Sequence, residues 1–450
     1  MKLKPYPEYK DSVEWIGEIP KNWNCSKIKH IADVKISNVD KKSKPYEPDV
    51  LLCNYTDVYN NEFIIDNLDF MKATASIEQI KKLSLKKGDV IITKDSEAAD
   101  DIAVPALVKD NFDNVVCGYH LALIRPDVDI QGDYLFRLLE SKQINDQFVI
   151  AANGVTRFGI STYPIKNSYL MVPSIEEQEK ISSFLDKKTS EIDLTIEKDT
   201  RLIELLKEKR TSLINRVVTK GLDPTVKMKD SGAEWIGEIP EDWEMMKFKR
   251  VSSKITQGPN PDLSADVELS NYKVLKTKDL YDDGIRYNFT DYLSEDAYLD
   301  CVNSRLEDQD ILITIVGHGS IGKINIFESQ KEHYIFTRAI ALVRPLTNQI
   351  NPIFIKYFFQ SKLGKELLYS LIEGSTGQEV IKTTKLSDLK IIRPPIEYQN
   401  EIIEILDIKT QNIDLTIQKI QDNIELLEEY KKSLIHHVVT GKVDVREVAV

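Results

Sequence analysis

The sequence contains an internal repeat that spans most of its length, and this repeat constrains the fold more than any other feature. The stretch EWIGEIPKNW begins at Glu14 and EWIGEIPEDW begins at Glu234, an offset of 220 residues. A longer match begins at Pro173 and again at Pro394, an offset of 221 residues. All four tryptophans of the chain lie in the two short copies. The duplicated order of short motif, variable segment and long segment predicts two equivalent halves.

The two long segments carry apolar residues at alternating heptad positions, which is typical of a coiled coil. The two stripes match in length and phase, so we expect two helices that pair with each other, antiparallel, rather than two separate core helices. About 40 residues at ~1.5 Å per residue would give a rod on the order of 60 Å. Asp199 and Arg210 are polar members of the first seam. The apolar seam residues are Leu185, Ile192, Ile196, Ile203, Leu206, Leu213 and Val217 in the first segment, and Leu406, Ile413, Ile417, Ile420, Ile424, Leu427, Leu434 and Val438 in the second.

The variable segments, about residues 25–172 and 245–393, are strand-rich and each large enough for a domain. Val90–Thr93 and Ile311–Ile315 are short β-branched runs, and a short helix is expected after each Arg-Pro pair. The predicted fold class is therefore α+β: two mixed α/β domains separated by a long antiparallel coiled coil, with an internal pseudo-twofold repeat. The predicted divisions are an N-terminal segment plus first domain (1–172), a central helix (173–220), a linker plus second domain (221–393), and a C-terminal helix and tail (394–450).

Composition narrows the class of protein. The net charge of −12, from 60 basic and 72 acidic residues, weakens a nucleic-acid hypothesis, although it can hide a local basic groove. Cys25, Cys53, Cys117 and Cys301 form no C-x-x-C pair, so neither a zinc site nor a disulfide scaffold is expected. The sequence contains no apolar run near the ~18 residues of a membrane span and no signal-peptide core. These features predict a cytoplasmic protein without a membrane partner.

The stretch DILITIVGHGSIGKINIF, residues 310–327, contains a glycine spacing found in nucleotide-binding loops. Gly317, Gly319 and Gly322 give G-x-G-x-x-G, and Lys323 follows them. A phosphate-binding loop must lead into a helix. Here Ile324 follows the lysine where a Walker loop has Ser or Thr, and KINIFES alternates as a strand does. We therefore predict a glycine-rich β-turn loop whose backbone could approach a nucleic acid closely.

Two further pairs of loops occupy equivalent positions in the two halves and carry side chains suited to reading DNA. ANGVTRFG and EGSTGQEV each combine a glycine with small polar groups and then Arg or Gln, which can pair with base edges in the major groove. CGYHLAL and FTRAIAL form the other pair. Taken singly, each residue reads as an ordinary surface position; the paired placement favours the loops as groups. The candidate DNA-binding residues in these loops are Tyr119, His120, Asn153, Thr156, Arg157, Arg338, Ser375, Thr376 and Gln378.

The chain resembles a specificity subunit of a type I restriction–modification system over essentially all its length. The resemblance rests on the repeated EWIGEIP…W, on the P-x-I-E-x-Q openings PSIEEQEKI and PPIEYQNEI, and on DILIT…GSIGK. It implies a DNA-recognition subunit without catalytic residues or a metal site, whose two target-recognition domains each read one half of a split DNA sequence. The coiled coil would set the spacing of the half-sites.

The resemblance also implies partners and cofactors. Two modification subunits would methylate adenine with adenosylmethionine, and restriction subunits would cleave double-stranded DNA with ATP and magnesium; this chain would bind no cofactor itself. His318, Ser320 and Lys323 of the glycine loop would reach towards the duplex. The first half has SEAADD in place of this loop, so Lys94, just before it, is the better DNA-binding candidate there. The alternatives are a nucleotide-using enzyme acting through Gly317–Lys323, or a scaffold that holds two protein-binding domains apart.

Overall fold

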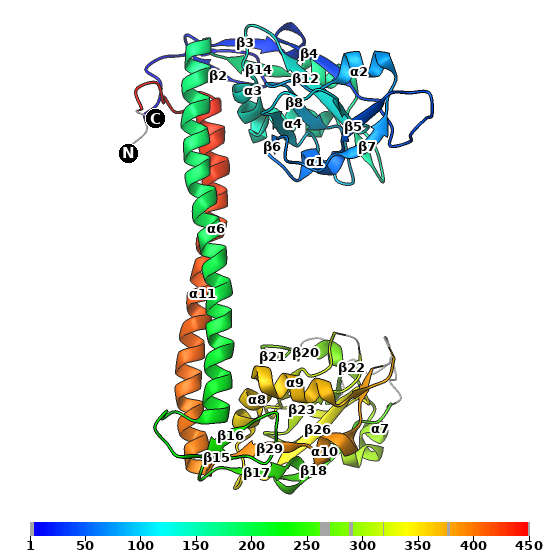
Figure 1. Ribbon diagram of the computed structural model, residues 1–450, viewed down its shortest axis with the longest axis vertical. Coiled ribbons are helices and arrows are strands. Elements are labelled where there is room, and N and C mark those ends of the chain that lie inside the picture. The colour runs from blue at the N-terminus through cyan, green and yellow to red at the C-terminus, as the bar shows by residue number, and fades with distance from the viewer. Residues whose placement is uncertain (1–3, 262–270, 288–290, 318, 376–378, 449–450) are drawn as a thin grey trace. The chain divides into compact units, whose positions relative to one another are not determined.

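The computed structural model describes residues 4–261, 271–287, 291–317, 319–375 and 379–448. The chain divides into two compact units (Figure 1). Unit 1 comprises Met1–Asp199 and Gln421–Val450, and unit 2 comprises Thr200–Ile420. Each unit contains one variable segment and half of each long helix. Among the described residues, no helix is long and apolar enough to cross a membrane.

Unit 1 is built on a five-stranded sheet in the order β4-β12-β8-β10-β6. The central strand pairs are antiparallel, and β6 joins the edge in parallel to β10. A second sheet has the order β11-β5-β7, and a helical pair follows β12. The bounds are β4 (Ala32–Ile36), β5 (Asp49–Cys53), β6 (Phe63–Ile64), β7 (Met71–Thr74), β8 (Val90–Thr93), β10 (Pro105–Val108), β11 (Val115–Cys117), β12 (Leu121–Pro126), α3 (Gly132–Leu139) and α4 (Lys142–Ala151).

Unit 2 repeats this plan. Its main sheet has the order β18-β26-β23-β24, its second sheet has the order β22-β19-β25, and two helices again follow the strand that ends in Arg-Pro. The bounds are β18 (Ser252–Gln257), β19 (Tyr272–Leu275), β22 (Asp291–Tyr292), β23 (Ile311–Thr314), β24 (Ile324–Ile326), β25 (His333–Phe336), β26 (Ile340–Pro345), α8 (Pro352–Gln360) and α9 (Lys362–Ser370).

The central strands are buried on both faces because each sheet lies between two apolar clusters. Along β8, Val90 and Ile92 pack into the cluster that includes α3 and α4, whereas Ile91 points into the cluster of the second sheet. Along β23, Ile311 and Ile313 face one cluster and Leu312 faces the other. This alternation is the two-residue period of a strand. Continuous apolar runs are therefore expected in the central strands of each domain.

The long helices are α6 (Ile175–Lys220) and α11 (Ile396–Val439), and they run antiparallel in each unit. In unit 1, Asp193 pairs with Lys431 at 2.9 Å, and Asp199 accepts a 3.0 Å hydrogen bond from Asn423. The partner number on α11 falls as the number on α6 rises, as it does in an antiparallel pair. In unit 2, Arg210 pairs with Asp414 at 2.9 Å. The polar seam residues Asp199 and Arg210 thus have partners across the helix pair. Every apolar residue assigned to the seam is buried or partly buried.

The repeated EWIGEIP…W motif forms a two-stranded sheet with the residues just before it in each unit. Its strands are β1 (Tyr9–Asp11) with β2 (Glu18–Pro20) in unit 1, and β15 (Met228–Asp230) with β16 (Glu238–Pro240) in unit 2. The last tryptophan of each copy, Trp23 or Trp243, is fully buried. In unit 1 the two ends of the chain meet, since Lys4 bridges Asp444 and Tyr9 donates to the Gly441 carbonyl at 3.0 Å. Segments from the beginning and from the end of the sequence thus complete unit 1 together.

The predicted fold class is confirmed: two mixed α/β domains and two long antiparallel helices, with an internal repeat. The helices begin at Ile175 and Ile396, close to the predicted starts. The four-part division of the chain stays a prediction.

Candidate nucleic-acid interface

Four predicted residues of the first domain come together beside the end of β8. Lys94 directly follows β8 and His120 directly precedes β12, and because these strands are neighbours the Lys94 amide donates to the His120 carbonyl at 2.9 Å. The Lys94 ammonium lies over the Tyr119 ring at 5.3 Å. Nη2 of Arg157 lies 3.3 and 3.4 Å from the two ring nitrogens of His120. The backbone thus gathers three basic groups and one aromatic ring.

Asp95, which the sequence analysis did not single out, ties this cluster together. Its Oδ2 lies 2.8 Å from Nζ of Lys94 and 2.6 Å from Nδ1 of His120. Burial raises the pKa of Asp95, but the hydrogen bonds from Lys94 and His120 outweigh that effect and hold the pKa below its usual value. The carboxylate therefore stays ionised and fixes the two basic side chains rather than leaving them mobile.

The ANGVTRFG segment forms a hairpin against this cluster. Its β13 (Phe158–Gly159) pairs with β9 (Asp95–Ser96), and Asn153 bridges Gly159. The turn is tight, since a Cβ on Gly154 would lie 1.9 Å from the Arg157 carbonyl oxygen. Asn153, Thr156 and Arg157 are all exposed on it. All six candidate residues of the first domain therefore lie around one surface.

The glycine loop of the second domain is a β-hairpin loop. It joins β23 to β24, and β24 begins at Ile324, directly after Lys323. The lysine is thus followed by a strand and not by a helix, as the sequence predicts. Nζ of Lys323 donates to the Leu280 carbonyl at 3.3 Å and lies 5.8 Å from the centre of the Tyr281 ring. Ser320 donates to the Gly317 carbonyl at 3.2 Å.

The EGSTGQEV segment lies beside the glycine loop. Val316 bridges Val380 of β28 (Val380–Ile381), which pairs with β27 (Ile372–Glu373). Ser375 is exposed next to this hairpin, and Arg338 is exposed just before β26. Three predicted residues, His318, Thr376 and Gln378, lie outside the described residues. The loops of the second domain thus meet at the position equivalent to the Lys94 cluster.

The two domains carry different chemistry at this shared position. Lys94 and Asp95 correspond to Ile315 and Val316, and Tyr119 corresponds to Arg338. The first domain therefore presents a fixed ionic cluster, whereas the second presents an apolar strand end, a glycine loop and an exposed arginine. Equivalent frames with different loop chemistry suit the recognition of two different ligand sequences.

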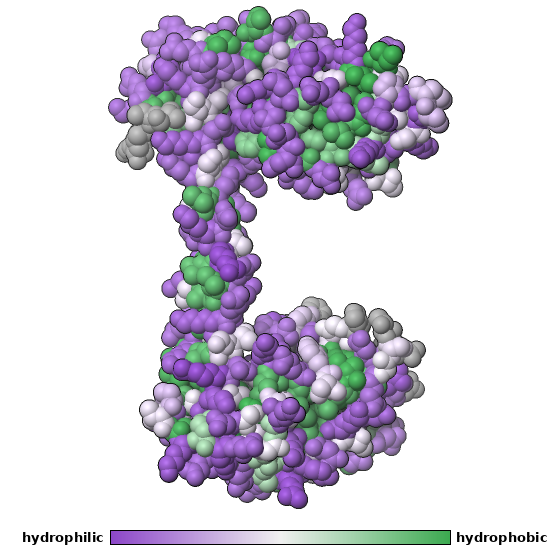
Figure 2. All heavy atoms as spheres, viewed as in Figure 1, coloured by the Kyte–Doolittle hydropathy of each residue, from purple (hydrophilic) through white to green (hydrophobic). Residues whose placement is uncertain are grey.

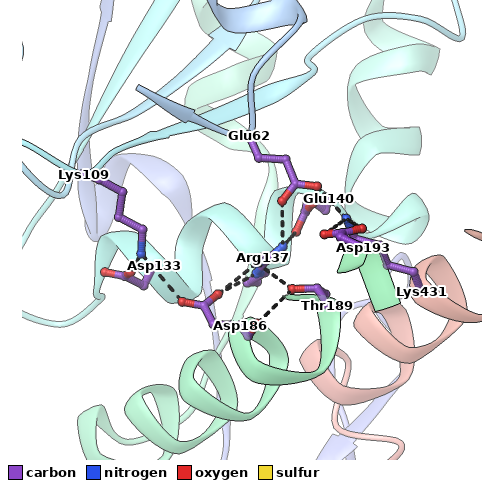
Figure 3. Close-up of polar contacts among 9 residues, drawn as sticks. All are labelled: Glu62, Lys109, Asp133, Arg137, Glu140, Asp186, Thr189, Asp193 and Lys431. Atoms are coloured by element: carbon purple, nitrogen blue, oxygen red, sulfur yellow. Dashed lines mark hydrogen bonds and ion pairs between the residues drawn. The ribbon is translucent and has the colours of Figure 1, made fainter. Parts of the chain in front are cut away.

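A buried polar network holds the first domain on the long helices (Figure 3). The side chain of Arg137, on α3, is almost fully buried and donates to Asp186 of α6 at 2.9 Å, to Thr189 of α6 at 3.1 Å and to Glu140 at 2.9 Å. Burial raises the pKa of Glu140 to about 7. The contacts to α6 fix the orientation of the domain on the helices of unit 1.

Lys431 of α11 extends the same network. Its Nζ lies 2.7 Å from Glu62, in the segment before β6, and 2.9 Å from Asp193 of α6. One lysine therefore connects both helices with the first domain.

In unit 2 a smaller polar network connects the second domain with α11 at the equivalent position. Tyr357 of α8 stands where Arg137 stands in unit 1, and its hydroxyl bonds Asp407 and, at 3.3 Å, Thr410 of α11. Burial, followed by the hydrogen bond to Asp407, raises the pKa of Tyr357 to about 12. Neither network was predicted from the sequence. The signal was there: Asp186, Thr189 and Asp193 recur 221 residues later as Asp407, Thr410 and Asp414, and Arg210 recurs as Lys431.

Comparisons with known proteins agree with this architecture. The model of the type I restriction modification DNA specificity domain matches residues 20–206 and again 240–426. The chain is 25% identical over 440 residues to the type I restriction enzyme MjaVIII specificity subunit of Methanocaldococcus jannaschii, which covers 96% of this chain and 95% of the relative. It is 24% identical over 471 residues to the MjaIX specificity subunit of that organism, covering 100% and 99%.

Solved structures share the fold. A chain of a type I R-M system, from work on its complex assembly and conformational transition, has a TM-score of 0.72 at 15% identity and covers 94% of this chain and 99% of its own length. The HsdS subunit of Thermoanaerobacter tengcongensis has a TM-score of 0.57 at 15% identity, with 94% and 98% covered. The twice-matched family model spans most of the sequence, and the chain therefore belongs to the type I restriction–modification DNA specificity family.

Proposed function

We propose that this chain binds a bipartite double-stranded DNA target, with one half-site read by each domain. One observation carries the proposal: two equivalent frames present loops at the same position, with different side chains. In the first domain Lys94, His120 and Arg157 converge, and in the second the glycine loop lies beside the Glu373–Val380 loop, with Arg338 exposed nearby. Arginine can pair with guanine edges, and a glycine loop can lie against the backbone.

The chain directs chemistry that its partners perform. Two modification subunits methylate adenine in both half-sites with adenosylmethionine, and restriction subunits supply ATP- and magnesium-dependent cleavage. This chain holds no cofactor of its own. The acidic net charge of −12 suits a subunit that shares its DNA contacts with partners.

The long helices supply the docking surface for the modification subunits. Leu194 and Leu415 are equivalent residues and both are half-exposed, as are Leu205 and Leu426. Figure 2 shows apolar residues at the surface of the helices among hydrophilic ones. Leucines that face solvent off the seam contribute little to pairing of the helices, and they suit contact with a protein partner. Their occurrence as equivalent pairs fits two copies of one partner.

The experiment uses a purified complex of this chain with its modification subunits and a library of random DNA. Sequencing of methylated adenines should recover two fixed half-sites separated by a spacer of constant length. Equal methylation of all sequences would contradict the proposal.

The coiled coil acts as the spacing element. Deleting one heptad from both helices, at matching positions, should change the preferred spacer and leave both half-sites as they were. A change in half-site identity with an unchanged spacer would contradict this role.

A further inference from the structure

The two tryptophans of each repeated EWIGEIP…W motif lie in opposite environments. Trp23 and Trp243 are fully buried and pack edge-on against Tyr6 and Tyr398, respectively. The burial explains why both halves keep them. Trp15 and Trp235 are 40% and 38% exposed, so burial does not explain why both halves keep these first tryptophans. Large exposed aromatic side chains are enriched at protein interfaces.

The local contacts of the exposed tryptophans differ between the halves. Nε1 of Trp15 donates to the Gln143 carbonyl at 3.0 Å, and the Gln143 side chain donates back to the Ile16 carbonyl at 2.9 Å. In unit 2 the residue equivalent to Gln143 is Leu363, and Nε1 of Trp235 makes no hydrogen bond to a described residue. The hydrogen bonds that Trp15 and Ile16 make with Gln143 in unit 1 thus have no counterpart with Leu363 in unit 2, although the tryptophan is present in both units. What the two sites share is a half-exposed indole.

A shallow hollow adjoins each exposed indole. The hollow beside Trp15 is lined by Glu14, Gln143 and Asp146. The hollow beside Trp235 has an apolar side and a charged side. The lining residues of the second hollow include Leu367, Leu371, Leu389, Lys385 and Asp388. An indole beside an open hollow can pack with an inserted apolar or aromatic side chain.

We infer that Trp15 and Trp235 are equivalent anchor points for two copies of one protein partner, the modification subunit, which inserts an apolar or aromatic side chain beside each indole. This inference rests on the proposed function and adds a second contact to the one on the long helices. The duplicated motif carries the assignment, because a surface kept in both halves fits a partner that binds twice. The hollow in unit 1 fits DNA poorly, since Glu14 and Asp146 line it and would repel phosphates. The charged residues of the hollow in unit 2 are Lys385, Lys390 and Asp388, so charge does not argue against DNA there.

The first experiment measures assembly with the full-length chain. Trp15→Ala and Trp235→Ala are made singly and together, and native mass spectrometry counts the modification subunits bound per chain. Each single variant should weaken one of the two binding steps about 10-fold or more, and the double variant should weaken both. Tyr46→Ala in unit 1 and Leu299→Ala in unit 2, both at exposed apolar positions, are matched controls that should bind two copies as the parent does. Equal assembly of the double variant and the parent would overturn the inference.

A second measurement covers the case in which an alanine variant folds poorly. The chain is labelled with 5-fluorotryptophan, and its four fluorine resonances are assigned with Trp→Phe variants. Unlabelled modification subunit should shift the Trp15 and Trp235 resonances and leave those of Trp23 and Trp243 in place. A complex that forms with all four resonances unchanged would overturn the inference alone. Shifts produced by target DNA without the subunit would assign the indoles to DNA instead, and failure of the unmodified chain to form any complex would count against the proposed function itself.

Discussion

Replacing Arg137 by methionine should destabilise unit 1 by about 3 kcal/mol, the lower end of the range for breaking a buried charge pair. Arg137 is 1% exposed and donates to Asp186, Thr189 and Glu140. Methionine keeps most of the packing against Phe136 but removes the guanidinium that Glu140 and Asp186 both bond. The loss is therefore electrostatic more than steric.

The assay is urea unfolding of the full chain, with hydrogen exchange of α3 and β12 reporting on unit 1 separately from unit 2. Tyr357→Phe is the matched control in unit 2. It removes one hydroxyl that bonds Asp407 and Thr410, and it should cost about 1 kcal/mol because Asp407 is exposed and can be hydrated. Replacing Arg137, Glu140 and Asp186 together by apolar residues should recover much of the loss. A loss below about 1 kcal/mol for Arg137→Met alone would refute the view that this network anchors the domain.

Three further predictions follow from individual contacts. Burial raises the pKa of Glu140 to about 7, so the folded state holds a proton that the unfolded state releases at lower pH. The melting temperature of unit 1 should therefore fall as the pH rises from about 5 to 7, and Glu140→Gln should flatten that fall. An unchanged slope would exclude Glu140 as its source. Gly441→Ala should destabilise unit 1 by more than Gly232→Ala destabilises unit 2 in thermal melts. Both glycines have a positive φ, but of the two only a Cβ on Gly441 would clash, at 2.5 Å from Pro20. Equal losses would show that the Pro20 ring moves aside. Arg157→Ala should weaken DNA binding at one half-site only, and Lys323→Ala should weaken it at the other half-site by a smaller factor, because the Lys323 ammonium already bonds the Leu280 carbonyl. A loss at both half-sites for either variant, measured by footprinting, would contradict the assignment of one half-site to each domain.

The sequence predicts the frame of this protein well because the frame depends on periodicity. The heptad stripes predict α6 and α11, and the β-branched runs predict β8 and β23. The glycine loop could be assigned to a hairpin because Ile324 and the alternation after it favour a strand over a helix. Each of these inferences uses only local spacing, which the chain carries in its order of residues.

The contacts that depend on burial and pairing could not be predicted in the same way. Asp95 lies just before the acidic run SEAADD and has no periodic signal, yet it fixes Lys94 and His120. Arg137 reads as a solvated residue of a short helix, yet it lies against α6. Ion pairs between segments far apart in the chain carry no periodic signal, and only the recurrence of Asp186 as Asp407 and of Lys431 as Arg210 marks them.

The measurement that tests the central claim most directly is a map of methylated adenines across a genome, made with and without this chain and with the modification subunits present in both cases. We predict that the chain adds methylation at one bipartite sequence, with an adenine in each half-site and a spacer of fixed length. Methylation that is unchanged by the chain, or that falls on a single continuous sequence, would contradict the account.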